Sequence, residues 1–324
     1  MSEAVHEEIH YRPRRGELVP PGGVDLHARD MTATFAADVT LAEAQRRLAE
    51  IGQWLPVDGD PAASLGDLVS FNSTGPLRLG YGAWRDLLLG VQFANGRGEL
   101  ITAGGRTVKN VAGYDLTKFM VGQRGVFGRI VTLTTRTYRR PAGALLARHR
   151  PDYTVLLRLL PTALRPQWAV LTRDELLCGY ASDETTLDWY EANVRGSEPL
   201  GVDRRALEGD VEHRASLWKF GTGEGSFRAS VPPARVQEFV AGARPETWCA
   251  DAAFGIVIGE VSPDRITSLH EAASGTGGAI MFSGETEGPH RSPLPSDVER
   301  RIIERLKTAF DPDQKLSPLP WQVR

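Results

Sequence analysis

Cysteine is scarce in this chain of 324 residues, which contains only Cys178 and Cys249 and no CxxC pair. A zinc or iron–sulfur site built from cysteine is therefore excluded, and a reducing, cytoplasmic setting is favoured. No apolar run reaches the ~18 residues of a membrane-spanning helix, and we expect no secretory signal in the polar first residues. The net charge of −3 leaves no basic excess for nucleic-acid phosphates.

Catalytic motifs are also missing. The sequence contains no GxSxG, HExxH or GxxxxGK(S/T) motif. Its seven histidines include no pair at metal-ligand spacing in the C-terminal half, so we expect no metal site, and each is expected at the surface. These histidines are His6, His10, His27, His149, His213, His270 and His290. No catalytic residue is assigned from the sequence.

The composition is that of an ordinary globular protein, with 41% hydrophobic and 24% charged residues, and the length suits two domains. A composition shift at Arg139-Arg140-Pro141 marks the predicted boundary between them. We expect an extended lead-in over 1–30, a first domain over 31–141, a second over 142–295, and a helix and tail over 296–324 that return to the first domain.

Several stretches show the end signals and periodicity of regular elements. Thr40 and Glu43 have capping-box spacing and predict a helix with the apolar face Leu41, Ala44, Leu48 and Ile51. Ser296 and Glu299 predict a final helix lined by Val298, Ile302, Leu306 and Phe310. Further helices are expected over 112–121, 184–194 and 234–241, strands over 31–39, 129–138, 227–231 and 255–261, a hairpin over 87–105, buried or strand-like pieces over 153–160 and 168–171, and a flexible turn over 275–278. Two strand–helix–strand units in the second half suggest a small sheet covered on one face.

The stretch from Gly104 to Tyr138 organises the chain. Its short predicted helix ends near Gly122, and Gly122, Gly125 and Gly128 then recur every third residue before a strand rich in Val, Ile and Thr. Such glycines let backbone N–H groups approach an anionic or flat ligand, although a plain helix-to-strand connection also fits them. The order helix, glycines, strand disfavours an NAD site, which needs strand, GxGxxG, helix.

A second unusual stretch runs over residues 64–90, SLGDLVSFNSTGPLRLGYGAWRDLLLG. Small, hydroxyl and amide residues stand among apolar ones, and if buried these groups need partners, because an unpaired buried polar group costs about 1–3 kcal/mol. A flavin offers suitable partners in its pyrophosphate and ring edge. A surface loop of Ser, Asn and Gly is the alternative.

Together these stretches resemble a known family. KNVAGYDLTKFMVG followed by QRGVFG is similar to a segment of the FAD-binding subunit of glycolate oxidase, in the superfamily of vanillyl-alcohol-oxidase or PCMH-type flavoproteins. The similarity extends over residues 30–141, with fainter matches in WKF…FRASVPP and at Phe310-Asp311-Pro312. The resemblance implies an α+β fold, in which a PCMH-type FAD-binding domain with a truncated N-terminal lobe precedes a smaller α/β cap domain.

The resemblance also implies which residues contact non-covalently bound FAD. They are Pro56, Ser64, Leu65, Gly66, Ser70, Ser73, Gly75, Arg78, Tyr81, Gly82, Lys109, Asn110, Val111, Gly113, Gly125, Gly128, Ile130 and Val131. Lys109 would neutralise phosphate charge, although a solvated lysine fits the sequence equally well. Two departures stand out. Asp67 replaces a family glycine, and Gln123, Arg124 and Val126 replace residues of which two carry hydroxyls.

The resemblance implies an FAD-binding subunit of a glycolate or D-lactate-like 2-hydroxy-acid oxidase or dehydrogenase complex. Its partners would be a catalytic flavoprotein subunit and an iron–sulfur subunit that receives electrons, in the cytoplasm or peripheral to the inner membrane through the complex. The pyrophosphate loop of the family's first lobe has no clear counterpart beyond Pro21-Gly22-Gly23. A degenerate relative without flavin, acting as an interaction subunit, therefore remains the alternative.

Overall fold

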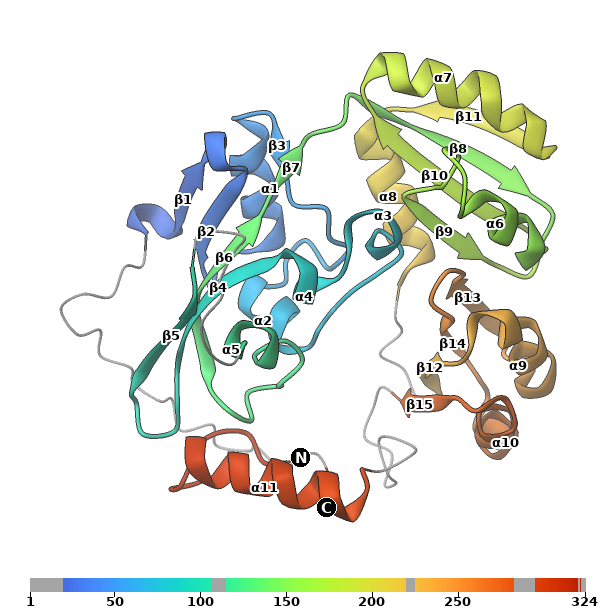
Figure 1. The fold of residues 1–324 in the computed structure, drawn as a ribbon. Coiled ribbons are helices and arrows are strands. Elements are labelled where there is room, and N and C mark those ends of the chain that lie inside the picture. Colours follow the sequence, from blue (N-terminus) through green and yellow to red (C-terminus); the bar gives the residue numbers. More distant parts are fainter. Residues whose placement is uncertain (1–19, 106–114, 220–224, 283–294, 320, 322–324) are drawn as a thin grey trace.

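The structure is a computed structural model that describes residues 20–105, 115–219, 225–282, 295–319 and 321. A five-stranded and an eight-stranded sheet organise these residues, one on each side of the molecule in Figure 1. A two-stranded ribbon of β3 (Gln53–Trp54) and β7 (Tyr138–Arg139) lies where the chain leaves the first sheet for the second. Short 3-10 turns are η1 (Pro21–Gly23), η2 (Ala28–Asp30), η3 (Arg195–Ser197), η4 (Pro233–Arg235) and η5 (Pro263–Arg265).

The five-stranded sheet is antiparallel in the order β1-β2-β6-β4-β5. Its strands are β1 (Val24–His27), β2 (Thr32–Ala36), β4 (Leu88–Ala94), β5 (Leu100–Gly104) and β6 (Arg129–Arg136). The central strands are rich in β-branched residues, which suit a pleated and buried surface. Where β2 and β6 pair, the buried hydroxyls of Thr34 and Thr134 satisfy each other through a hydrogen bond of 2.9 Å.

Short helices pack on this sheet and close its core. They are α1 (Leu41–Ala49), α2 (Leu65–Ser70), α3 (Arg78–Tyr81), α4 (Trp84–Leu87) and α5 (Leu116–Phe119). The Thr40 hydroxyl accepts a hydrogen bond from the Glu43 N–H and caps α1, as its capping spacing predicts. The largest buried side chains of the core, Phe35, Leu48, Leu65, Trp84 and Phe93, come from these helices and from the strands under them.

The eight-stranded sheet consists of two consecutive βαββαβ units. The first contains β8 (Gly143–His149), α6 (Tyr153–Leu159), β9 (Trp168–Leu171), β10 (Leu176–Ser182), α7 (Glu184–Val194) and β11 (Gly201–Arg205). The second contains β12 (Ser226–Ser230), α9 (Val236–Ala243), β13 (Thr247–Asp251), β14 (Ile256–Glu260), α10 (Ile266–Thr276) and β15 (Ala279–Phe282). The sheet order is β11-β8-β10-β9-β13-β14-β12-β15. Each unit has the ferredoxin-like strand order, and the order of the second unit is the reverse of the first. The units therefore join through the antiparallel pair β9·β13.

The two faces of the eight-stranded sheet have different coverings (Figure 1). Apolar residues of α6, α7, α9 and α10 form one continuous core with the outer face. The inner face packs against α8 (Leu207–Leu217) and against Trp54 and Leu77 of the five-stranded part. The inner face is therefore the one that meets the first sheet and its loops.

The last helix, α11 (Asp297–Phe310), returns to the five-stranded part and lies beneath it in Figure 1. Its capping box of Ser296 and Glu299 forms as predicted. Phe310 packs against Phe119 with 5.6 Å between ring centroids, and the Phe310 carbonyl accepts a hydrogen bond from the N–H of Gly96 in the β4–β5 turn. The helix thereby anchors the end of the chain on the first sheet.

The structure confirms most of the predicted elements and corrects several. Residues 153–159 are helix α6 rather than strand-like, and α10 continues through Gly275, where a flexible turn was predicted. The lead-in over 1–30 contains strand β1, which pairs with β2. The second sheet has eight strands and is not small. Ile51 lies beyond α1, and Val298 and Ile302 are 59% and 53% exposed, so their predicted apolar faces are incomplete. The domain boundaries stay a prediction.

Candidate functional site

The two unusual stretches of the sequence meet in the fold. The N–H of Gly122 donates to the Val69 carbonyl over 3.0 Å, and the N–H of Arg124 donates to the Ser70 carbonyl over 2.9 Å. The side-chain amide of Gln123 adds a hydrogen bond of 3.2 Å to the Ser70 hydroxyl. Three successive residues of the glycine loop, residues 122–128, thus bind the end of α2.

The start of α2 is packed against β2 and β6. A Cβ on Gly66 would lie 2.8 Å from the Ala37 Cβ, and the Ala37 N–H donates to the Val131 carbonyl. Ser64 caps α2 through the Asp67 N–H, and its hydroxyl also donates to the Asp67 carboxylate over 2.7 Å. The Asp67 carboxylate, at the position of a family glycine, therefore accepts a hydrogen bond within the cap of α2.

Asn72 provides a test of whether this junction suits a flavin. It lies between the two loops, where a Cβ on Gly122 would come within 3.3 Å of its Cβ. Its backbone is left-handed, with φ of 50°, and its buried side-chain oxygen has no hydrogen-bond partner within the described residues. An unsatisfied buried acceptor is costly unless a donor reaches it. The N–H groups of a flavin or adenine ring are donors of the required kind, so the junction fits FAD.

Other predicted contacts are turned away from the loop junction. A Cβ on Gly75 would lie 2.6 Å from the Asp58 Cβ, and one on Gly82 2.7 Å from the Asp86 Cβ. Tyr81 packs edge-on against Trp54 and Tyr138, and burial raises its pKa to about 12. These residues, like Arg78, lie where the five-stranded part meets the inner face of the second sheet.

The remaining predicted contacts fall into three groups. Leu65 and Ile130 are buried in the first core, and the space beside Gly128 is filled by Phe93. Pro56 is buried, Ser73 is half-buried, and the Ser73 carbonyl accepts a hydrogen bond from the Trp84 indole over 2.8 Å. Lys109, Asn110, Val111 and Gly113 lie outside the described residues. Gly125, with φ of 75°, is backed by the Ser317 side chain.

A group of arginines lies where the glycine loop meets the second sheet. The Arg78 Nε donates to the Asp251 carboxylate over 3.0 Å, and its guanidinium lies 3.9 Å above the Phe254 ring. Arg124 of the glycine loop reaches the Met281 sulfur of β15 over 3.0 Å. Arg228 extends from β12, beside Met281 in the strand register, and forms no hydrogen bond or ion pair within the described residues.

Electrostatics of this arginine group favour an added anion. Burial lowers the pKa of Arg228, and repulsion from Arg78 lowers it further, as does Arg124. Burial raises the pKa of Asp251 to about 7, although Arg78 opposes this shift. One carboxylate thus faces several guanidinium groups in a partly desolvated place, and a second anion would relieve their repulsion.

A buried ion-pair network fixes the second sheet to the segment 75–82, which contains α3 and Arg78. The Arg214 guanidinium on α8 donates to Asp58 over 2.6 Å and also pairs with Asp210. The other Asp58 oxygen accepts from the Leu77 N–H over 2.8 Å, and the Trp168 indole donates to Asp210. Since Arg214 is almost fully buried, the network sets the position of α3 and Arg78 relative to the second sheet.

Sequence reasoning missed several of these residues. Asn72 stands in the unusual stretch but was not assigned a contact, and Arg228 lies inside the FRASVPP run that matches the family faintly. For Arg228 the available signal is the alternation of side chains between the two faces of β12. Phe227 and Ala229 face the outer core, so Arg228 lies on the opposite face. Asp251 gives no comparable signal, because only the folded sheet brings it to Arg78.

The histidines need one correction. His149 is 1% exposed, not at the surface, and burial lowers its pKa, with the charge of Arg158 as the second cause.

Among the described residues no group of three or more His, Cys, Asp or Glu side chains is placed to hold a metal ion. None of the described helices is long and apolar enough to span a membrane. Both cysteines are free and buried, and burial raises the pKa of each thiol to about 12.

Comparisons with known proteins agree with this geometry. Residues 21–104 match the family model described as an FAD binding domain. Alkyldihydroxyacetonephosphate synthase has a similar fold, with a TM-score of 0.66 at 14% identity over 90% of this chain and 65% of that chain. The chain therefore contains a PCMH-type FAD-binding domain with an attached α/β part.

Similar sequences specify the kind of flavoprotein further. The glycolate oxidase subunit GlcE of Escherichia coli is 32% identical over 39% of this chain and 37% of that protein. The mitochondrial cytochrome-type D-lactate dehydrogenase of Arabidopsis thaliana is 30% identical over 40% of this chain and 25% of that protein. A D-2-hydroxyglutarate dehydrogenase of Xanthomonas citri is 31% identical over 86% of this chain and 52% of that protein. The chain is thus similar to FAD-binding oxidoreductases that include 2-hydroxy-acid enzymes, and it matches only part of each relative's length.

Proposed function

We propose that this protein is the FAD-binding subunit of an oxidoreductase complex that acts on glycolate or another small 2-hydroxy acid such as D-lactate. FAD is held without a covalent bond, and electrons pass to a partner iron–sulfur subunit beside a catalytic flavoprotein subunit. The matched FAD-binding domain and the names of the similar proteins support this proposal. The location we propose is the cytoplasm, or the inner-membrane surface through the complex, and the two free cysteines favour it.

The single observation that carries the proposal is the arginine group beside the loop junction. A 2-hydroxy acid has a carboxylate, and guanidinium groups bind carboxylates through paired, charge-assisted hydrogen bonds. Arg228 has no partner within the described residues, whereas Arg78 is already held by Asp251. Arg228 is therefore the group that we assign to the substrate carboxylate.

The other residues have supporting roles in this proposal. FAD, when bound, supplies the acceptor for the hydride that leaves the substrate α-carbon. Asn72 accepts a hydrogen bond from a ring N–H, and the hydrogen bonds from Gly122 and Arg124 to the end of α2 keep the two loops in register. Asp251 holds Arg78 against Phe254 and so keeps a second positive charge beside the carboxylate.

Flavin binding is tested first. The purified chain is dialysed against FAD, and its visible spectrum is recorded before and after acid precipitation. We expect a yellow protein that releases its flavin into the acid supernatant. Colourless protein that does not retain added FAD overturns the proposal and supports a relative that serves as an interaction subunit without flavin.

The substrate assignment is tested with Arg228→Gln in the FAD-loaded chain. Glycolate and D-lactate are added without oxygen, and bleaching of the flavin is followed, with the partner subunits present if the chain alone does not react. Loss of a charge-assisted hydrogen bond costs about 1.5–3 kcal/mol, so the substrate concentration for half-maximal rate should rise roughly tenfold or more. Arg195→Gln, at an exposed arginine of η3, is the matched control. Equal values for the two variants would contradict the role of Arg228.

A further inference from the structure

The seam between the two βαββαβ units has a hollow on its outer face. Each unit covers its own half of the sheet with two helices, and β9·β13 is the strand pair that joins the halves. At this seam a pocket of about 530 Å³ opens between α9, the turn after β9 and the residue that precedes α6. Its volume lies within the range of small-molecule sites, which favour boundaries between structural units.

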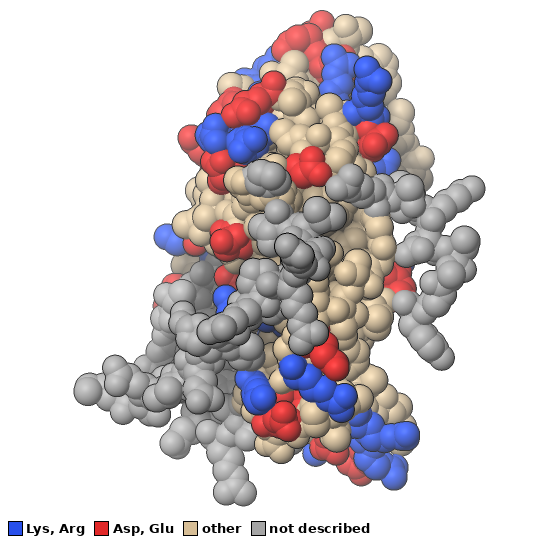
Figure 2. All heavy atoms as spheres, turned by 90° about the vertical axis from the view of Figure 1, so that its left-hand side faces the viewer, with Lys and Arg blue, Asp and Glu red and all other residues tan. Residues whose placement is uncertain are grey.

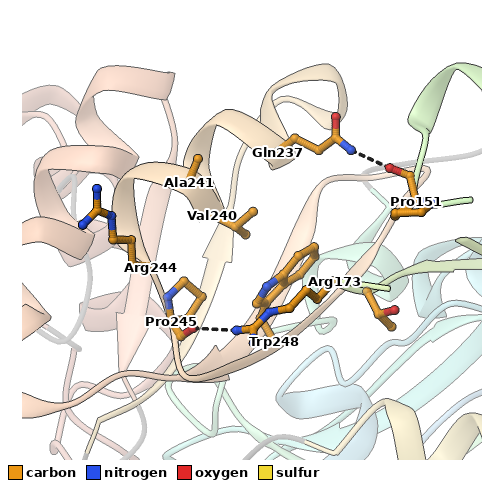
Figure 3. A pocket seen from close by; sticks show the side chains of 9 residues that line it. Pro151, Arg173, Gln237, Val240, Ala241, Arg244, Pro245 and Trp248 are labelled. Carbon is orange, nitrogen blue, oxygen red and sulfur yellow. Dashed lines mark hydrogen bonds between the residues drawn. The ribbon is translucent and has the colours of Figure 1, made fainter. Parts of the chain in front are cut away.

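The lining of this seam pocket combines apolar and cationic groups. Val240 and Ala241 of α9, Pro245 and the Trp248 ring of β13 supply apolar surface, and Arg173 and Arg244 supply the charge. The other lining residues are Pro151, Thr172 and Gln237. Figure 3 shows Val240 and Trp248 between Arg244 on one side and Pro151 on the other. Gln237 bridges the two units by donating to the Pro151 carbonyl over 2.7 Å.

The charge of the seam pocket is uncompensated by its own lining, which contains no Asp or Glu side chain. Arg173 donates only to the carbonyls of Pro245 and Glu246, over 3.4 and 3.3 Å, near the limit for a hydrogen bond. Arg244 forms no ion pair within the described residues and has a left-handed backbone, with φ of 48°, at the end of α9. The lining thus combines two arginines and an indole ring without a neutralising carboxylate.

We propose that the seam pocket binds a small organic anion in which a flat ring carries a carboxylate or phosphate. The ring would lie against Trp248 and Val240, because aromatic groups bury large apolar areas and stack favourably. The anionic group would be held by Arg173, with Arg244 as a second cation, since guanidinium groups match both carboxylate and phosphate geometry.

This site is separate from the flavin site. Trp248 and α9 belong to the core on the outer face of the sheet, whereas Asp251 pairs with Arg78 on the inner face. A ligand in the seam pocket would therefore act as an effector that braces the two units against each other. The proposal does not rest on the oxidoreductase function, and its test can fail or succeed independently of flavin binding.

The test measures binding directly in the full chain after loading with FAD and removal of the free FAD, so that adenine compounds do not enter the flavin site and no free FAD competes with the probes. The probes are 4-hydroxybenzoate, a ring with a carboxylate, and AMP, a ring system with a phosphate. Saturation-transfer NMR should show magnetisation reaching the ring protons of at least one probe. A response from 4-hydroxybenzoate alone points to a free aromatic acid, and a response from AMP alone points to a nucleotide.

Variants show whether the probes bind in the seam pocket. Arg173→Gln combined with Arg244→Gln should weaken binding at least about tenfold, because both positive charges of the lining are lost. Both side chains are exposed, and circular dichroism checks that the double variant folds. Trp248→Leu should abolish the ring signal, and circular dichroism checks that it folds. Arg195→Gln and Trp189→Leu, at exposed positions of the first unit, should bind like the unchanged chain. No transfer to either probe, or wild-type binding in the double arginine variant, overturns the proposal.

Discussion

Single residues decide how tightly the two loops pack, and Gly66 is the clearest case. Any Cβ at this position would come within 2.8 Å of the Ala37 Cβ and 3.0 Å of its carbonyl oxygen. We expect Gly66→Ala to lower the free energy of unfolding by about 1–3 kcal/mol through overpacking, and to weaken FAD retention as α2 shifts. Urea denaturation and dialysis against FAD measure the two effects. Gly196→Ala, with no atom within 4 Å of its Cβ, is the control and should leave both unchanged.

A buried histidine makes stability depend on pH. The two ring nitrogens of His149 have no partner within the described residues, and burial lowers its pKa, so the folded chain keeps the ring neutral. Below a pH of about 6.5, the pKa of a histidine in an unfolded chain, the unfolded chain binds a proton at His149 that the folded chain does not bind. Stability from this residue is thus complete above that value and is lost as the pH falls.

The measurement is the urea midpoint at a pH above and a pH below the unfolded histidine pKa. We expect the midpoint to fall on acidification, and to fall less in His149→Phe, which removes the titrating group and keeps a ring of similar shape. His270→Gln, on the half-buried side of α10, is the control. A fall of the same size in His149→Phe and the unchanged chain would show that other groups cause it.

Residue roles could be predicted from the sequence only where local chemistry determines them. Thr40 and Ser296 act as helix caps because their partners stand three residues away in the chain. Asn72 and Asp251 escape such reasoning, because the burial of one and the arginine partner of the other arise from residues distant in sequence. Leu65 and Ile130 show the converse, since their side chains belong to the core and leave only their backbone for a cofactor.

At the scale of elements, α11 braces the glycine loop from outside. The Lys307 ammonium donates to the carbonyls of Val126 and Ser317, over 3.1 and 2.9 Å, and pairs with Asp311. Asp311 in turn accepts the N–H groups of Lys315 and Leu316. One buried lysine therefore joins α11, the segment after it and the loop that contains Gly125.

Removal of this lysine should loosen the end of the chain. Lys307→Met leaves Asp311 buried without its cation, and breaking a buried ion pair in this way costs about 3–5 kcal/mol. We expect a lower urea midpoint and faster release of bound FAD, measured by flavin fluorescence. Lys315→Met breaks an exposed pair with Asp313 and should change stability by less than about 1 kcal/mol. Similar losses in both variants would contradict the bracing role.

Element prediction succeeded where a periodic pattern had clear ends and failed where burial hid the pattern. The helix α7 was predicted with the bounds that the structure shows, and there Asp183 caps it. In α6 the run YTVLLRL is rich enough in apolar and β-branched residues to suit a strand, and only the sheet beneath it shows which face is buried. The exposed Val298 and Ile302 show that an apolar stripe alone does not guarantee a covering partner.

The whole molecule combines an FAD-binding sheet with a duplicated βαββαβ unit, of which the sequence predicted only two strand–helix–strand pieces. Duplication is visible only in the strand order, since the two units share topology rather than residues. On the face shown in Figure 2, positive and negative side chains are mixed at both ends. Family resemblance identified the flavin domain, whereas the arginine group follows from the way the two sheets meet, and the seam pocket from the way the two βαββαβ units join within one sheet.

The Arg214 network is the connection through which the two parts of the molecule are held together. Arg214→Met leaves Asp58 and Asp210 buried without a cation, and we expect a loss of about 3–5 kcal/mol in the free energy of unfolding. Because Asp58 also holds the Leu77 N–H, the Arg78 loop should loosen and exchange its amide hydrogens faster. Denaturant titration and hydrogen exchange over residues 75–82 measure these effects.

Two further variants separate the loss of the connection from the cost of unpaired charge. Arg204→Met removes an exposed arginine that pairs with Glu184 and Asp188 inside the first unit, and it should leave the exchange over residues 75–82 unchanged. Asp58→Asn and Asp210→Asn, added to Arg214→Met, remove the buried negative charges and should restore much of the stability. If stability returns while the Arg78 loop still exchanges rapidly, the network acts by positioning the loop. If exchange over residues 75–82 never changes, the Arg214 network does not position this segment.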